Sequence, residues 1–188
     1  LPAEVDLAAA EQELAQQEDH LMQLKIKLAP VADQYDYILL DCPPSLGLLT
    51  MNALVAATEV VVPMQAQFLA LQGLSKLLET VQLVRQKLNA KLKVSGVVLA
   101  LHDGQTNLAS EVVADLESFF NAAKMFAMPW SGAVIYQPPI RRNIKLAECP
   151  SFGQTVFEYA PSCAGALDYQ ALGDALMGLE AGAVPKVQ

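Results

Sequence analysis

The chain has 188 residues, of which 53% are hydrophobic and 17% are charged, and its formal net charge is -8. This length suits one domain, or a part of one. The negative charge excludes a protein that coats nucleic acid over its whole surface, because affinity for phosphate comes mainly from Lys and Arg. The apolar runs are shorter than the roughly 20 residues of a membrane span, so the sequence predicts a soluble protein without a membrane partner.

The cysteine content favours a reducing compartment. Cys42, Cys149 and Cys163 are an odd number with no CxxC spacing, and no signal-peptide pattern precedes them. We therefore expect a cytoplasmic protein.

The first half of the chain predicts helices alternating with apolar strands. Residues 6–29 place leucines at helical spacing and are followed by Pro30. The stretch "YDYILLD" (35–41) predicts a strand that is buried on both faces, and 46–57 predicts a helix with Ser45 as a plausible N-cap. A strand at 59–64, a long helix at 68–88 and a strand at 93–102 are expected next.

The second half continues this pattern and ends in helices. Residues 106–120 predict a helix with Thr106 or Asn107 as its cap, and 121–139 predict a loop-rich insertion around a short "AVIY" strand. A turn of helix in "IRRNIKLAE" and a helix at 164–180 are expected before a frayed tail at 181–188. Together these elements predict an α/β fold, a mostly parallel sheet with helices on both faces.

Asp41 stands where ligands bind in such folds, beyond the carboxyl end of a parallel strand. A carboxylate here can hold Mg²⁺ beside the phosphates of a nucleotide, directly or through water. An equally plausible reading is that Asp41 only caps the next helix or binds backbone amides in the turn. Pro43 and Pro44 stiffen the segment after it and could make it move as a unit, or they simply end the strand. Gly47 suggests close packing or close backbone approach.

Four blocks in order carry a resemblance to a known family: "YDYILLDCPPSLGLLTMNAL", "VVVPMQAQFLALQGLSKLLETVQLV", "TNLASEV" and "RRNIKLAECPSFGQTVFEYAP". Together they resemble the ParA/Soj chromosome and plasmid partition ATPases, which belong to the deviant Walker A branch of the phosphate-loop (P-loop) NTPases. The resemblance implies a P-loop NTPase-like fold and ATP and Mg²⁺ as cofactors. It also implies a homodimer that binds DNA without sequence preference, and a ParB-like centromere-binding partner in the nucleoid.

The resemblance also implies roles for single residues. Asp41 matches the family's magnesium-linked carboxylate, and Pro43 and Pro44 match the switch segment after it, so we expect all three in the catalytic site. Arg141 and Asn143 are expected at the nucleotide. DNA contacts are expected from Arg142, Lys145 and Gln105, although Gln105 stands where the family usually has Arg. Without the family match, Arg142 and Lys145 would be read as a solvated basic helix face.

One family motif is absent, because no Gly here precedes Lys and no Gly-Gly pair exists. The glycine-rich lysine loop that cradles phosphates therefore has no counterpart in this sequence. Because the chain also opens without Met on "LPA", which looks like the exit of a strand, we expect an N-terminal truncation. On this view residues 1–180 are the C-terminal two-thirds of one ATPase domain, which lacks the P-loop portion and is inactive alone. The alternative is a non-enzymatic DNA- or protein-binding module that keeps the ParA scaffold.

Overall fold

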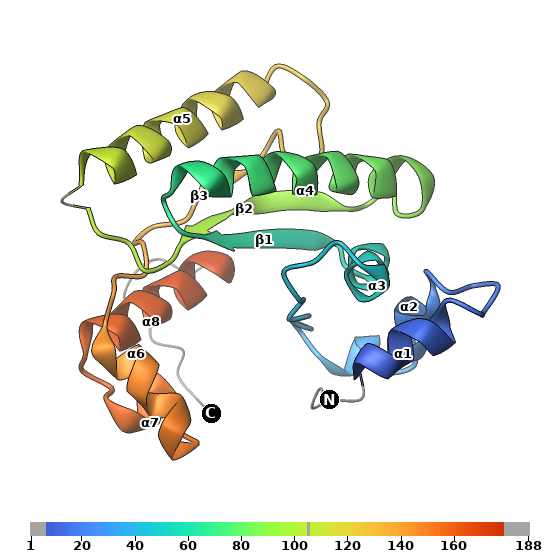
Figure 1. The fold of residues 1–188 in the computed structure, drawn as a ribbon, viewed down its shortest axis with the longest axis horizontal. Helices are drawn as coiled ribbons and strands as arrows, with labels where there is room; N and C mark the ends of the chain where they lie inside the picture. The colour runs from blue at the N-terminus through green and yellow to red at the C-terminus, as the bar shows by residue number, and fades with distance from the viewer. Residues whose placement is uncertain (1–6, 105, 179–188) are drawn as a thin grey trace. The chain divides into compact units, whose positions relative to one another are not determined.

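A computed structural model of the chain describes residues 7–104 and 106–178, with the side chains of 7–10, 68 and 69 left aside. The chain divides into two compact units, and the boundaries lie within a helix and two strands. Unit 1 comprises residues 1–60 and 75–94, and unit 2 comprises residues 61–74 and 95–188. The elements (Figure 1) are α1 Leu7–Leu14, α2 Gln23–Leu28, a 3-10 turn Ala32–Gln34, α3 Leu48–Ala56, β1 Glu59–Met64, α4 Phe68–Lys87, β2 Lys93–Leu99, α5 Asn107–Ala123, β3 Val134–Ile135, α6 Ile144–Glu148, a 3-10 turn Cys149–Phe152, α7 Val156–Tyr159 and α8 Ala164–Leu176.

In unit 1, α1 and α2 pack against α3. The buried side chain of Asn52, on α3, holds the preceding segment in place. Its amide nitrogen donates to the carbonyl oxygen of His20 at 2.7 Å, and its Oδ1 accepts the N–H of Leu24 at 3.2 Å. Since both groups of this amide are satisfied, Asn52 can be buried at little cost.

A second buried amide closes the other end of α3. Asn89, which follows α4, donates through Nδ2 to the carbonyl oxygens of Leu54 at 3.0 Å and Ala57 at 2.6 Å. These carbonyls belong to the last turn of α3 and lack helical partners, so Asn89 acts as a C-terminal cap supplied from elsewhere in the chain.

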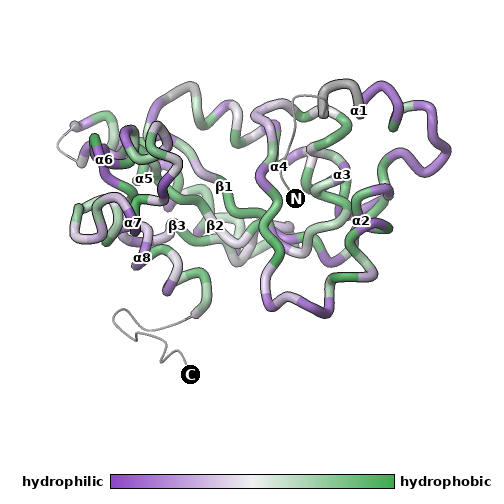
Figure 2. The backbone as a smooth tube through the Cα atoms, turned by 90° about the horizontal axis from the view of Figure 1, so that it is seen from below, coloured by the Kyte–Doolittle hydropathy of each residue, from purple (hydrophilic) through white to green (hydrophobic). Residues whose placement is uncertain are grey.

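The sheet has three strands in the order β1-β2-β3. β2 pairs with β3 in parallel, with Gly96 opposite Val134. Thr58 accepts from Lys93 N–H, and Met64 accepts from Ala100 N–H at 2.8 Å, so β1 and β2 also advance in the same direction. Figure 2 shows the later part of β2 as strongly hydrophobic, as expected for a strand that is buried on both faces.

Unit 2 has helices on both sides of its part of the sheet, with α5 on one side and α8 on the other (Figure 1). α5 buries a face formed by Ala109, Val112, Leu116, Phe120 and Ala123. On the other side, Val98, Ile140 and Leu172 form a cluster that joins β2 to α8. The predicted α/β class with a parallel sheet is therefore confirmed.

The strand that the sequence predicts at 35–41 is absent. Residues 35–43 have neither helical nor strand structure, and residue 39, a leucine, is 90% exposed, with Tyr35 and Tyr37 each 63% exposed. A strand forms only when its N–H and C=O groups pair with a neighbour, and the described residues provide none for this segment. The prediction of a buried strand at 35–41 was therefore wrong.

Two smaller predictions also differ from the structure. The helix expected at 6–29 is two short helices, because residues 15–22 form turns; Figure 2 shows this connection as hydrophilic. Ser45 is not the N-cap of α3: Gly47 occupies that position without a side-chain hydrogen bond, and the Ser45 carbonyl instead accepts from the Thr50 hydroxyl at 2.6 Å.

The remaining elements agree with the sequence to within a few residues. Thr106 caps α5, since its hydroxyl accepts the N–H of Ala109 at 3.3 Å. The strands at 59–64 and 93–102 and the long helix after Phe68 are present, and "AVIY" contains β3. The tail predicted at 181–188 lies outside the described residues. Among the described residues, no helix is both long and apolar enough to cross a membrane.

Candidate functional site

The carboxyl ends of β2 and β3 bring two predicted regions of unit 2 together. After β2, His102 forms an isolated parallel bridge with Arg141, and the His102 N–H donates to the Ile140 carbonyl at 2.9 Å. Leu101, just before, has φ of 50°, which is unfavourable for a residue with a branched side chain. Strained backbone of this kind persists where the surroundings enforce it, commonly at functional sites.

His102 carries a further sign of a binding site. Its Nδ1 is buried and has no hydrogen-bond partner among the described residues. A buried polar atom without a partner is costly, so such atoms mark places where water or a ligand completes the structure. Nothing in the sequence pattern singles out this histidine.

Arg141 is held by a carboxylate from α8. Its Nη2 lies 2.7 Å from Asp168 Oδ1, its Nε lies 3.0 Å from Oδ2, and its backbone N–H also donates to Oδ2 at 3.0 Å. The Asp168 side chain is only 3% exposed, whereas that of Arg141 is 57% exposed. Hydrogen bonds from Arg141 hold the pKa of Asp168 below its usual value, despite its burial. The role of Arg141 at a nucleotide stays a prediction, and the structure adds that this side chain fixes the loop.

Arg142 and Asn143 follow directly and differ in their contacts. Arg142 is exposed, and among the described residues its guanidinium has neither a hydrogen bond nor an ion pair. Asn143 is the N-cap of α6, because its Oδ1 accepts the N–H of Lys145 at 2.9 Å. Its Nδ2 has no such bond within the described chain, so the donor side of this amide is the part that could meet a ligand.

Lys145 belongs to a small polar network. Its Nζ lies 2.8 Å from Glu148 Oε2, which also accepts the Tyr159 hydroxyl at 3.1 Å, and it sits 5.6 Å from the centroid of the Tyr159 ring. The ammonium of Lys145, followed by the Tyr159 hydroxyl, lowers the pKa of Glu148. The charge of Lys145 is thus partly neutralised by Glu148. Arg142 has no such partner among the described residues, so it is the more available of the two cations.

Asp41, Pro43 and Pro44 lie in the exposed segment of unit 1 that precedes α3. The Asp41 carboxylate makes no hydrogen bond or ion pair with any described residue, so it caps no helix here. Burial, and then the charge of Asp41, raises the pKa of the neighbouring Cys42 thiol. An exposed carboxylate that binds no described residue suits Mg²⁺, because this ion keeps several water ligands and is usually bound by one or two protein carboxylates.

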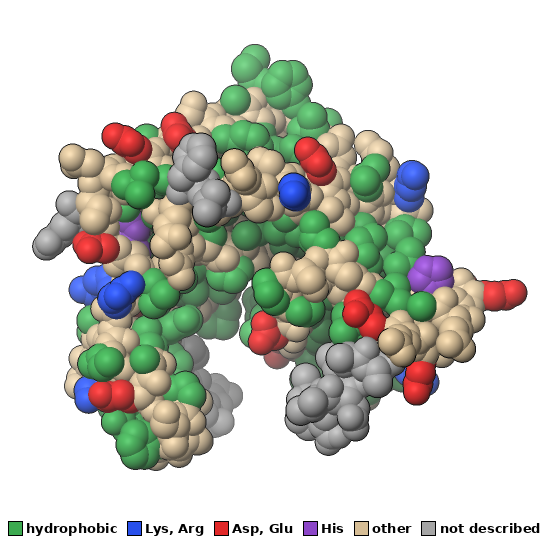
Figure 3. All heavy atoms as spheres, viewed as in Figure 1, with side chains coloured by type: hydrophobic (Ala, Val, Ile, Leu, Met, Phe, Trp, Pro, Cys, Tyr) green, Lys and Arg blue, Asp and Glu red, His purple; other side chains and the backbone are tan. Residues whose placement is uncertain are grey.

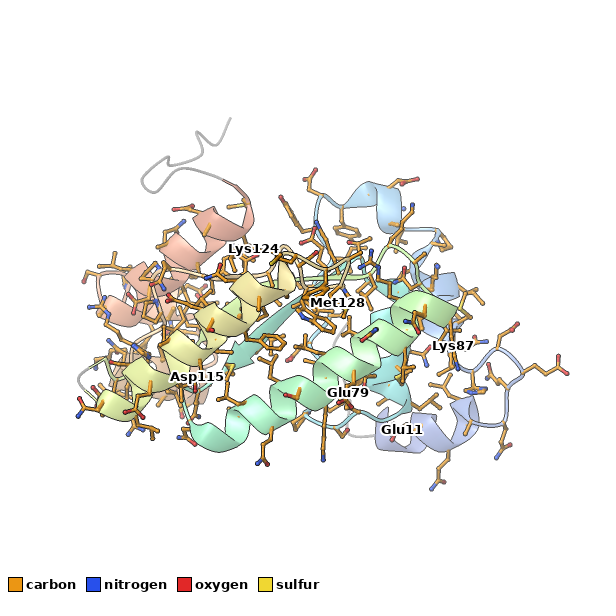
Figure 4. The ribbon with its side chains drawn as sticks, turned by 90° about the horizontal axis from the view of Figure 1, so that it is seen from above. Glu11, Glu79, Lys87, Asp115, Lys124 and Met128 are labelled. Atoms are coloured by element: carbon orange, nitrogen blue, oxygen red, sulfur yellow. The ribbon has the colours of Figure 1, made fainter. Side chains whose placement is uncertain are left out.

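The start of α3, close to this segment, already holds an anionic group. Glu11 Oε1 accepts the N–H of Leu49 at 3.3 Å (Figure 4 labels Glu11). A carboxylate at a helix N-terminus is favourable, because the free amides there carry partial positive charge. A Cβ at Gly47 would come within 2.5 Å of this oxygen, so the neighbour at Gly47 is the end of the Glu11 side chain and not a backbone.

Not all predicted residues can be placed. Gln105 lies outside the described residues. Among the residues that the structure describes, no three His, Cys, Asp or Glu side chains gather as a metal centre. The segment 141–145 is brought together within unit 2, and Asp41, Pro43 and Pro44 are brought together within unit 1.

Sequence reasoning missed Asp168 in the loop's framework, and it named Asn143 only as a nucleotide residue and not as a helix cap. Asp168 stands in "GALDYQ", where nothing in the pattern marks a buried carboxylate. Asn143 was detectable as a cap, because Asn is a preferred N-cap and "IKLAE" follows it.

Comparison with known proteins gives these residues a family context. A family model described as AAA domain matches residues 1–94. The chain is 42% identical to the chromosome partitioning protein ParA of Myxococcus xanthus, covering 94% of this chain and 59% of that protein. It is also 42% identical to the chromosome-partitioning ATPase Soj of Treponema pallidum, covering 92% of this chain and 64% of that protein.

A solved structure agrees with this. Cobyrinic acid a,c-diamide synthase from Mycobacterium smegmatis, crystallised with ADP and magnesium, superposes with a TM-score of 0.70 at 32% identity, covering 94% of this chain and 60% of that one. The chain thus spans about three-fifths of the length of the relatives it matches. With these matches and the parallel α/β fold, the chain belongs to the ParA/Soj-type partition ATPase family.

Proposed function

We propose that this chain is the C-terminal part of a ParA/Soj-type ATPase, and that it contributes Asp41 to the magnesium shell of bound ATP. The observation that carries the proposal is an exposed carboxylate without a partner among the described residues, just before the Pro-Pro segment that matches the family. Bound Mg²⁺ would neutralise phosphate charge during hydrolysis. The sequence has no glycine-rich lysine loop, so we expect residues 1–188 alone to be inactive.

For unit 2 taken by itself, we propose residues that would contact a nucleotide and DNA. The free Nδ2 of Asn143 suits an acceptor atom of a nucleotide. Arg142 suits a DNA phosphate, because its guanidinium is exposed and without a partner in the described chain. The orphaned Nδ1 of His102 lies in the loop beside them and supports ligand binding at this edge of the sheet. Arg141 would contribute chiefly through the ion pair that shapes the loop.

We place the intact protein in the cytoplasm, associated with the nucleoid. It would act there as a nucleotide-dependent homodimer that binds DNA without sequence preference, and a ParB-like centromere-binding protein would stimulate it. The family membership and the 42% identity to partition proteins support these assignments.

ATP turnover tests the role of Asp41. The longest open reading frame that contains this chain is assayed with Mg²⁺ and DNA, alongside its Asp41→Asn and Asp36→Asn variants. Asp36 is the matched control, since it is also exposed and precedes Asp41 in the same segment. We expect Asp41→Asn to lower turnover on the order of 100-fold, because a magnesium ligand is lost, and Asp36→Asn to leave it unchanged. Equal turnover in both variants would overturn the assignment.

DNA binding tests Arg142. In the same protein, Arg142→Ala should weaken binding to DNA of any sequence and reduce the slope of log affinity against log salt by about 1, because one phosphate contact is lost. Lys76→Ala, which removes an exposed cation from α4, serves as the control. If both variants bind like the parent, Arg142 makes no phosphate contact.

The alternative is a non-enzymatic module on the same scaffold. It predicts DNA binding by residues 1–188 alone, without nucleotide, that disappears when Arg142 and Lys145 are both changed to Ala. Nucleotide-dependent binding in the longer protein would favour the ATPase.

A further inference from the structure

The outer side of α5 and the turn after it expose large apolar side chains that are not buried in the core. Met125 is 86% exposed, Phe126 62%, Leu108 51% and Phe119 42%. Figure 3 shows hydrophobic side chains gathered over the end of α5. Exposed apolar residues that stand singly are ordinary, but a contiguous row of them marks an interaction surface.

These residues form one row with two carboxylates. The α5 helix continues past its last residue as a tighter turn, since the N–H groups of 124, 125 and 126 donate to carbonyls three residues earlier. Steps of three or four residues therefore keep one flank of the helix. Leu108, Glu111, Asp115 and Phe119 thus share one side of α5, and Met125 and Phe126 lie on the turn that follows it. We name these six residues the α5 flank.

The α5 flank is acidic and its charge is not neutralised locally. Glu111 and Asp115 are exposed and form no ion pair with any described Lys or Arg. α5 itself contains no basic residue, and the first cation after it, Lys124, donates to Asn121 Oδ1 at 2.8 Å (Figure 4 labels Asp115 and Lys124). A partner of complementary charge must bring Lys or Arg.

One aromatic of the flank is fixed in place by the core. The Phe119 ring stacks on Trp130 with centroids 6.4 Å apart, and it meets Phe120 edge to face at 5.4 Å. Trp130 and Phe120 are buried at 8% and 3% exposure. A ring held by buried neighbours loses little freedom when it is covered, which is typical of residues that dominate binding.

We propose that the α5 flank is the docking surface for a basic amphipathic helix of a partner protein. From Leu108 to Phe126 it extends for about 27 Å, so it matches a partner helix of about 18 residues. Lys or Arg of that helix meets Glu111 and Asp115, and its apolar face covers Phe119 and Phe126. Nucleic acid and anionic membranes are disfavoured by the carboxylates, and a second copy in a symmetric contact would bring like charges together.

The proposal is tested with a synthetic 18-residue helix of Leu and Lys, labelled for fluorescence anisotropy. A peptide of the same composition with its Lys and Leu positions shuffled is the control. The parent protein is this chain. The test variants are the double variant Met125→Ser/Phe126→Ser and the single variant Asp115→Lys. Leu167→Ser on α8, 58% exposed, and Glu79→Lys on α4 are the matched controls, and circular dichroism confirms that each variant is folded.

We expect saturable binding of the amphipathic peptide that weakens about tenfold in each test variant and stays unchanged in both controls. Hydrogen exchange of residues 108–126 should slow when the peptide is bound. Three results would overturn the proposal: no binding, equal binding of the shuffled peptide, or equal loss in the control variants. The test requires neither nucleotide nor DNA, so it stands apart from the ATPase assignment.

Discussion

Two segments carry the predicted site residues, and they are held in opposite ways. Residues 35–41 have no regular secondary structure and are mostly exposed, and the described chain offers them no strand to pair with. The loop at 140–145 is fixed on several sides, since Asp168 binds Arg141, Asn143 caps α6, and Ile140 is buried under α8. The difference teaches that a loop can be fixed by single side chains, whereas a strand needs a whole neighbouring backbone.

The largest expected effect is a difference in the free energy of unfolding between two leucine variants. The sequence predicts both leucines to be in buried strands. Leu99 in β2 is 1% exposed, so Leu99→Ala should lower the free energy of unfolding by about 2–5 kcal/mol. Leu39 is 90% exposed, so Leu39→Ala should change it by less than about 0.5 kcal/mol. Urea unfolding followed by circular dichroism measures both. A large loss at Leu39 would show that residues 35–41 are packed after all.

The next effect concerns the ion pair that fixes the second segment. Asp168→Asn keeps the shape of the side chain but removes the charge that Arg141 binds, and should cost about 1–2 kcal/mol of stability, discounted because Arg141 is half-exposed. Asp115→Asn, on the exposed flank of α5, is the control and should be neutral. Fluorescence of the single Trp, Trp130, follows unfolding of unit 2. Equal stability of the two variants would mean that the ion pair does not hold the loop.

The same carboxylate predicts a dependence on pH. The pKa of Asp168 is lowered in the folded chain, so the unfolded chain binds its proton more readily and stability rises with pH. Its contribution is complete above the unfolded pKa near ~3.9 and is lost as the pH falls through the lower folded pKa. In urea unfolding at a series of acid pH values, Asp168→Asn should show a shallower loss than the parent. Parallel curves would exclude Asp168 as a source of acid sensitivity.

A smaller effect is expected at the cap of α6. Asn143→Ala removes the acceptor of the Lys145 N–H and should cost about 0.5–1 kcal/mol. Asn143→Asp keeps that acceptor and should retain stability, while it removes the Nδ2 donor that we assign to the nucleotide. Comparing the two variants by urea unfolding and by nucleotide affinity in the longer protein separates capping from ligand binding. Equal nucleotide affinity of Asn143→Asp and the parent would contradict the ligand role.

Features that depend on residues close in the sequence were predictable, and features that depend on residues far apart were not. β1, β2, α4 and α5 follow from apolar periodicity, because each buries a face against neighbours within the chain. The cap by Thr106 was predictable because it is local. The Asp168 ion pair joins residues 27 positions apart, and the strained backbone at Leu101 has no signature in sequence, so neither could be foreseen.

The strand predicted at 35–41 was wrong although its apolar pattern is clear in the sequence. "YILL" is apolar because such residues suit burial in a sheet, yet in this chain it is exposed. The Asp41 assignment combines the family resemblance with an exposed carboxylate that binds no described residue.

Hydrogen exchange of residues 37–41 tests most directly the central proposal, namely that Asp41 lies at the nucleotide site of a ParA/Soj-type ATPase. The amides are compared between residues 1–188 alone and the longest open reading frame with Mg²⁺ and ATP. We predict rapid exchange in the former and slowing on the order of 100-fold in the latter, while the amides of 141 and 145 are protected in both. Equally rapid exchange of residues 37–41 in both proteins would contradict the account.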